Sequence, residues 1–122
     1  MANLVTSVGL REMAQLAGAV AGGLTMTHLE VGTGALTPAA GTTALVTASS
    51  PRVATTNTES GGVLTLEGFF TNSQVNGTLT EWALYSALTG GTLLACGTFT
   101  PSVVKTASDT LTCTVTVTLT AG

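Results

Sequence analysis

The end of the chain, from Thr110 to Thr120, alternates threonine with an apolar residue at every position. Side chains alternate across a β-strand, so this pattern predicts a strand at 110–119 with an apolar face and a threonine face. The apolar face belongs in a core. The threonine face carries no charge, although solvent-facing strands normally carry Lys or Glu, which discourage pairing with another chain. It therefore predicts a contact surface, with these candidate subunit contacts: Thr112, Thr114, Thr116 and Thr118. The alternative is that another strand layer or the early helix of the same domain covers this face.

The shortage of charge extends over the whole sequence. Charged residues make up 7% of the 122 residues, whereas an average soluble domain has about 25%. The hydrophobic share of 44% is ordinary, so Thr, Ser, Asn and Gly replace the missing charges. A chain of this length suits one domain, 1–122, with one modest core. Its surface would have little charge repulsion to keep copies apart.

The few basic residues argue against a nucleic-acid partner. The net charge is −3, and Arg11, Arg52 and Lys105 are the basic residues. Binding to phosphates needs clustered cations, so we expect each of the three to be solvated or in a local ion pair. The apolar stretch 13–24 is shorter than the roughly 20 residues that span a bilayer. It also lacks the basic start of a signal peptide, so we expect a soluble, uncleaved chain without a membrane partner.

A single helix is predicted near the start of the chain, at about 7–21. Thr6 or Ser7 can cap its beginning, and Gly22-Gly23 would end it. We expect its narrow apolar stripe to pack against the sheet, with a neighbouring subunit as the alternative. The residues at helical spacing that form this stripe are Leu10, Met13, Ala14, Ala17, Val20 and Ala21.

Beyond Gly23 the pattern is that of short strands separated by turns. Gly61-Gly62, Asn76-Gly77 and Gly90-Gly91 are turn signals, because glycine tolerates positive φ. The sequence predicts a mainly β fold, an antiparallel β-sandwich or small barrel of about six strands with one N-terminal α-helix. The predicted strands are 25–31, 52–59, 63–70, 78–87, 93–99 and 110–119.

The segment of about 32–51, rich in Gly, Thr, Ala and Pro, is too long for an ordinary connection. It is either a well-packed surface loop or an arm that reaches onto a neighbour. Because of the second alternative, Leu36 and Pro38 are also candidate subunit contacts.

Two cysteines remain to be placed. If 93–99 and 110–119 form a hairpin centred near Lys105, Cys96 lies directly opposite Cys113. Adjacent-strand disulfides are strained and depend on register. We therefore expect buried free thiols, with a disulfide bridge as the alternative. A zinc site needs four ligands and the single histidine, His28, is distant in sequence, so we expect no metal.

The sequence offers little for catalysis. His28 shares a predicted strand face with Met26 and Glu30, and no serine has the Gly-x-Ser-x-Gly context of a nucleophile elbow. Gly32-Thr33-Gly34 does not continue into a dinucleotide fingerprint or a P-loop. The carboxylates are scattered, so each is expected to be solvated or hydrogen-bonded: Glu30, Glu59, Glu67 and Glu81. We expect no enzyme, no catalytic residues and no cofactor.

Several segments resemble a family of bacteriophage proteins. They are Thr27-His28-Leu29-Glu30-Val31-Gly32-Thr33-Gly34, Pro38 with Thr43-Ala44-Leu45, residues 77–85, residues 90–95 and residues 105–111. Together with the preceding helix, their order resembles small structural modules of tailed bacteriophages, of the tail-collar fibre type. Thr33 stands where the family pattern carries an aspartate. The resemblance covers nearly the whole chain and implies a virion structural part without enzymatic residues.

The resemblance also implies where to look for a partner. A tail fibre normally continues into a shaft and a tip, whereas we expect this module to be complete at Gly122. We therefore expect a capsid decoration or cement protein, assembled in the host bacterial cytoplasm, that binds copies of itself, as a trimer for example, and the major capsid protein. The alternative is a tail, collar or fibre-attachment component that docks another virion protein.

From a different class, a carbohydrate-binding β-domain is a third hypothesis. Such a domain needs clustered aromatic side chains. Trp82 and Tyr85 are three residues apart and are therefore predicted on opposite faces of one strand.

Overall fold

The computed structural model describes residues 3–18 and 23–120. These residues form one α-helix and seven β-strands, all paired antiparallel. In chain order the elements are β1 (Leu4–Val5), α1 (Ser7–Ala17), β2 (His28–Gly32), β3 (Ala48–Ser60), β4 (Val63–Phe70), β5 (Gly77–Tyr85), β6 (Leu93–Lys105) and β7 (Leu111–Thr118).

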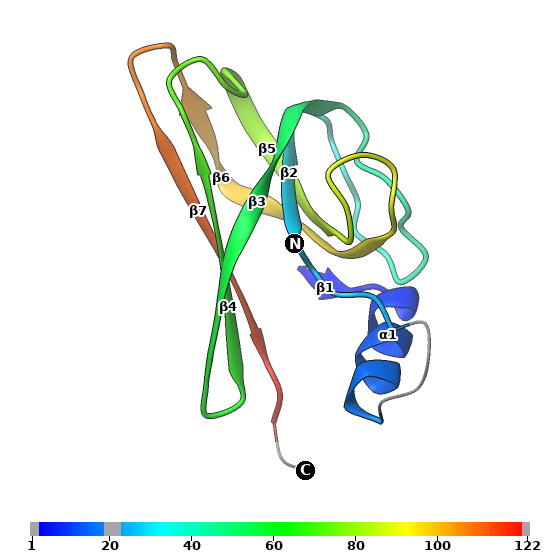
Figure 1. Ribbon diagram of the computed structural model, residues 1–122. Coiled ribbons are helices and arrows are strands. Elements are labelled where there is room, and N and C mark those ends of the chain that lie inside the picture. Colours follow the sequence, from blue (N-terminus) through cyan, green and yellow to red (C-terminus); the bar gives the residue numbers. More distant parts are fainter. Residues whose placement is uncertain (1–2, 19–22, 121–122) are drawn as a thin grey trace.

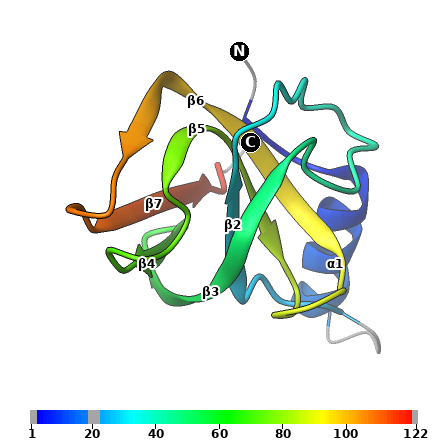
Figure 2. The same cartoon turned by 90° about the horizontal axis from the view of Figure 1, so that it is seen from above.

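The strands form one sheet in the order β1-β6-β5-β2-β3-β4-β7. The sheet curls into a half-barrel, and its curvature is clearest from above (Figure 2). Helix α1 lies beside the sheet, away from the tip of the β3–β4 hairpin (Figure 1). The predicted mainly β class with one N-terminal helix is therefore confirmed. The additional strand is β1, which spans two residues and is too short to show an alternating pattern.

Strand boundaries agree best beside the Gly61-Gly62 turn. The bounds of β4 are those predicted, and Gly61 and Gly62 make its turn with β3 at φ values of 59° and 85°. Strand β3 begins earlier than predicted, and strand β6 ends later. These additional residues include Ser, Thr and Pro, which give no clear strand pattern. The long segment between strands is consequently 33–47 rather than 32–51.

The predicted hairpin between 93–99 and 110–119 is wrong. Strand β6 pairs with β5 and β1, whereas β7 pairs with β4, so Cys113 lies opposite Gly68. Cys96 lies opposite Ala83 in β5. The Gly90-Gly91 turn joins β5 to one edge of β6, β1 pairs with the other edge, and β7 pairs with β4 instead. Both thiols are free and buried, as expected.

The main core fills the concave side of the half-barrel. Leu29, Phe70, Leu79 and Leu84 are among its fully buried side chains. Alternate residues of each strand point inward, so one curled sheet can enclose a core that two flat sheets would otherwise share. The other buried members are Met26, Val31, Leu66, Val75, Trp82, Leu94, Ala95 and Cys113.

A smaller apolar cluster lies on the opposite side of β5 and β6. Its buried members are Leu45, Ala83, Tyr85, Leu93 and Cys96, with Leu4 and Leu36 packed against it. Leu36 and Leu45 come from the segment 33–47, which therefore covers the convex side of its own sheet. Of the two alternatives for this segment, the packing of Leu36 and Leu45 favours a well-packed surface loop over an arm.

Helix α1 begins as predicted but presents a different face to the sheet. Thr6 is its N-cap and accepts a hydrogen bond from the Gly9 amide at 3.1 Å. Of the predicted apolar stripe, Met13 packs against the core as expected, whereas Leu10, Ala14 and Ala17 are exposed. Gly9 and Glu12 are buried instead. Gly9 allows the helix to approach β6, since an added Cβ would collide with the Leu94 carbonyl oxygen. The predicted helical residues 19–21 lie outside the described residues.

Candidate functional site

The threonine face of β7 (Thr112, Thr114, Thr116 and Thr118) is solvent-exposed on the outer side of the half-barrel. No described part of the chain covers it. Residues opposite these threonines in β4, and the next strand β3, extend the same surface. We call this surface the outer face, and its residues are Thr56, Thr58, Ser60, Val63, Thr65, Glu67, Phe69, Thr112, Thr114, Thr116 and Thr118.

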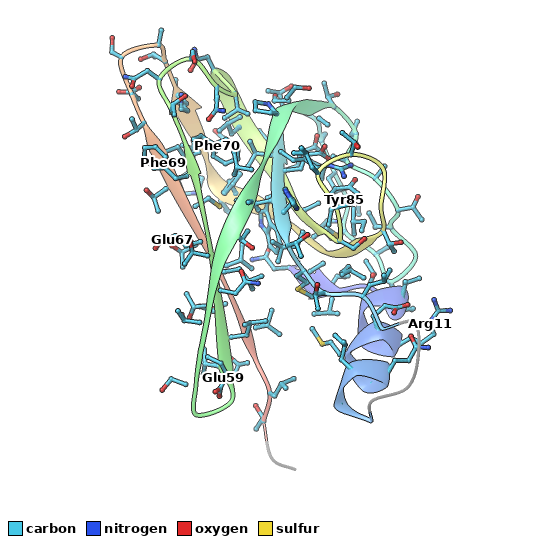
Figure 3. All side chains as sticks on the ribbon, viewed as in Figure 1. Arg11, Glu59, Glu67, Phe69, Phe70 and Tyr85 are labelled. Carbon is cyan, nitrogen blue, oxygen red and sulfur yellow. The ribbon has the colours of Figure 1, made fainter. Side chains whose placement is uncertain are left out.

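The outer face is almost free of charge. Glu67 is its one ionisable residue, and Phe69, which is 53% exposed, is its large apolar side chain. Phe69 and Glu67 point outward while Phe70 points into the core (Figure 3). Hydroxyl and methyl groups make up most of the remaining surface. This surface can offer hydrogen bonds and apolar contact to a partner without electrostatic repulsion.

Strand β7 also forms an edge of the sheet. Among the described strands it pairs with β4 alone, so alternate backbone N–H and C=O groups on its other side face outward. Natural edge strands are usually protected by Lys, Pro or a bulge. Residues 111–118 contain none of these protections. The edge is therefore open to pairing with another strand.

The two candidate contacts in the segment 33–47 are less available. Leu36 and Pro38 are half-buried, and Leu36 packs against the convex cluster. The segment is held by Glu81 of β5, whose carboxylate is fully buried. It accepts backbone N–H bonds from Gly34 (3.1 Å), Val46 (3.0 Å) and Thr47 (2.8 Å). The sequence pattern alone could not assign this role, because the three amides lie 34 to 47 residues away.

Arg52 fastens the β5–β6 turn. Its guanidinium donates to Glu30 at 3.0 Å and to the carbonyls of Ala87 and Gly90, and it lies 3.5 Å above the ring of Tyr85. Burial, followed by the Glu30 carboxylate, raises the pKa of Tyr85. The expected local ion pair is thus present at Arg52. Arg11 likewise pairs with Glu12 at 3.1 Å.

The environment of Lys105 differs from the solvated or ion-paired position predicted for it. Only 3% of the residue is exposed, and its ammonium donates to the Asn76 side chain at 2.8 Å and the Asn72 carbonyl at 3.3 Å. It is buried rather than solvated, and it makes no ion pair within residues 3–18 and 23–120. It closes the turn between β4 and β5, where Asn76-Gly77 was expected to turn the chain.

Groups that could perform chemistry are dispersed in the described residues. His28 Nδ1 lies 2.8 Å from the Thr27 hydroxyl, and burial raises the pKa of Cys113 to about 11, which disfavours its nucleophilic thiolate. Glu30 pairs with Arg52, while the Glu59 carboxylate accepts the Gly62 amide at 2.9 Å. The described part of the chain holds no cluster of three His, Cys, Asp or Glu residues suited to a metal ion.

Comparisons with known proteins assign the chain to no family. No protein-family model matches the chain, and no curated protein or solved structure matches it. Among the described residues, no helix has the length and apolar character required to cross a membrane. The outer face and the open β7 edge are thus the features on which a functional hypothesis can be based.

Proposed function

We propose that the protein is a non-enzymatic structural component of a bacteriophage virion, and that it decorates and stabilises the capsid as a cement protein. The observation that carries this proposal is the exposed, nearly uncharged outer face of β3, β4 and β7. The resemblance of the sequence to phage structural modules supplies the class of assembly.

The physical support concerns how such a face would bind. A cement protein must attach to a repeating surface through many weak contacts. A strand-built face of hydroxyl and methyl groups loses little side-chain entropy on contact, because Thr and Val are already restricted at χ1. It also has few charges to desolvate. These properties suit attachment to a capsid or to another copy of the chain.

A capsid cement protein and a tail component would both bind through the outer face, so the number of copies per particle distinguishes the two functions. In separated heads and tails analysed by mass spectrometry, the cement function predicts hundreds of copies on each head. A tail, collar or fibre-attachment component would instead be present in about a dozen copies or fewer at the neck or tail. Absence from both fractions would contradict the proposal as a whole.

A variant test assigns the binding to the outer face. Thr58→Lys combined with Thr112→Lys places two charges on that face at exposed positions. We expect the double variant to fold normally and to lose at least tenfold in binding to undecorated heads. The matched control is Thr43→Lys with Thr89→Lys, which changes exposed loop threonines and should bind as the wild type does. Equal binding by both double variants would exclude the outer face.

The aromatic residues considered for carbohydrate binding are not available on the surface. Trp82 packs in the concave core and Tyr85 in the convex cluster, so they lie on opposite faces as predicted, and both are buried. Stacking on a sugar needs exposed aromatic side chains, and Phe69 stands alone on the outer face.

A further inference from the structure

The number of strands leaves the half-barrel unable to close on itself in an antiparallel manner. Every neighbouring pair in the sheet is antiparallel, so direction alternates along the order β1-β6-β5-β2-β3-β4-β7. With seven strands, the two edge strands β1 and β7 point the same way. One further strand, running opposite to both, would restore the alternation and complete an eight-stranded barrel.

The two edge strands border the same groove. This groove, which we call the seam, has a volume of about 460 Å³ and is lined by residues 3–5, 98–100 and 113–118 together with Trp82 and Ala95. Its inner wall is apolar, with Trp82, Phe99, Val115 and Val117 among the lining side chains. None of the lining residues is charged. The seam therefore combines unpaired backbone groups with apolar side-chain space.

A second folded copy of the chain cannot fill the seam. A strand inserted between β1 and β7 needs two free edges, because it must pair on both sides. Each described strand of this fold already pairs with at least one neighbour. A copy could add one edge to β7 alone, but its own sheet would then occupy the other side.

We propose that the seam is an acceptor site for one extended segment of a partner protein, inserted antiparallel between β1 and β7. Backbone hydrogen bonds would supply affinity, and alternate side chains of the segment would enter the groove. Since β7 spans eight residues, a segment of about this length would pair along it. Its inward residues would be apolar and the segment uncharged, to match the lining. This inference concerns the seam and does not depend on the proposed capsid function.

The first experiment uses a synthetic peptide as the probe, acetyl-Thr-Val-Thr-Val-Thr-Val-Thr-amide, with the full chain. Trp82 is the single tryptophan of the sequence and lines the seam, so its fluorescence reports insertion. We expect saturable binding. Two control peptides carry N-methyl groups on all valines or on all threonines, which removes the amide donors of one edge or of the other. A strand inserted between two edges must lose at least tenfold in affinity with either control.

The outcomes separate insertion from simpler modes of binding. If only one N-methylated peptide is weakened, the peptide adds to a single edge and the proposal is overturned. If neither is weakened, the seam is an apolar groove without strand pairing, and absence of binding overturns the proposal outright. Hydrogen exchange provides the second measurement, in which the peptide should slow exchange in both Leu4–Val5 and Leu111–Thr118. The single variant Thr58→Lys should bind the peptide normally, since Thr58 lies in β3 and does not line the seam.

A covalent version tests whether the site accepts a strand within the chain. We would join the same seven residues to Gly122 through an Asn-Gly turn, with a control in which the three valines are proline. Proline cannot donate to a strand ladder. The valine extension should raise the midpoint of thermal unfolding and slow exchange in β1 and β7, whereas the proline extension should do neither. Equal behaviour of the two extensions would contradict the proposal.

Discussion

At the scale of single residues, the buried carboxylate of Glu81 connects two parts of the molecule that are distant in sequence. Its side chain lies beneath the segment 33–47 and satisfies three backbone amides. A buried charge is costly unless hydrogen bonds compensate for it. The position of the segment is therefore coupled to this one side chain.

Replacing Glu81 by glutamine tests that coupling. The amide has nearly the same shape, but it has no net charge and turns one acceptor into a donor that faces backbone N–H groups. We expect Glu81→Gln to lower the free energy of unfolding by about 2–4 kcal/mol, measured by urea denaturation. The exposed Glu67 accepts no such bonds, so Glu67→Gln should change stability by less than about 0.5 kcal/mol. Equal effects would refute the role assigned to Glu81.

The buried thiol of Cys113 should make the free energy of unfolding depend on pH in the alkaline range. Burial raises the pKa of its thiol from 9.0 to about 11, so the folded state retains a proton that the unfolded state releases. The associated stability is complete below pH 9 and is lost as the pH rises towards 11. Relative to a Cys113→Ala variant, the wild type should lose about 2–3 kcal/mol more between pH 8 and pH 12. Parallel pH profiles of the two proteins in denaturant titrations under reducing conditions would contradict this.

At the scale of elements, Thr6 connects the helix to the sheet. Its hydroxyl accepts the Gly9 amide and also lies 3.3 Å and 3.2 Å from the carbonyls of Leu93 and Leu94 in β6. Thr6→Ala should therefore lower the free energy of unfolding by about 1–2 kcal/mol. Thermal or urea unfolding measures the change, and Ser7→Ala, at an exposed neighbouring position, is the control. A variant as stable as this control would show that the cap contributes little.

Helices and strands with a clear pattern in their own sequence could be predicted, whereas the strands with which they pair could not. The Gly61-Gly62 turn placed β4, alternation placed β7, and the capping threonine placed the start of α1. The pairing of β7 with β4 rather than β6 depends on how the whole sheet curls. The burial of Lys105 likewise depends on Asn72 and Asn76, which reach it through that arrangement. The outer face was predictable for β7, because its alternation has no exception, but its extension over β3 and β4 follows from register.

At the scale of the whole molecule, Gly68 of β4 allows the sheet to curve tightly, because β4 can approach β2 over the intervening strand β3. A Cβ atom at this position would lie 2.8 Å from Leu29 Cδ2 and 3.2 Å from Val53 Cγ2. Val53 belongs to the adjacent strand β3, and Leu29 belongs to β2, the next strand in the sheet. A glycine here therefore helps the sheet to close around its core.

Gly68→Ala should force β4 away from Leu29 of β2 and Val53 of β3. We expect a loss of about 1–3 kcal/mol in the free energy of unfolding, measured by thermal or chemical denaturation. An added Cβ at Gly41 would meet no atom within 4 Å, so Gly41→Ala provides a control without crowding. If Gly68→Ala were as stable as that control, the close approach would not limit the curvature of the sheet.

The attachment of β1 and α1 to β6 has a consequence during protein synthesis. The Thr6 hydroxyl and its carbonyl partner on Leu94 are 88 residues apart, and β1 pairs with no strand that precedes β6. The ribosome therefore releases the N-terminal elements long before their docking surface exists. Val5, Val8 and Met13, which pack against the core in the finished fold, must wait in the nascent chain until β6 has emerged. Folding of this protein on the ribosome is thus expected to be completed only after most of the chain has been made.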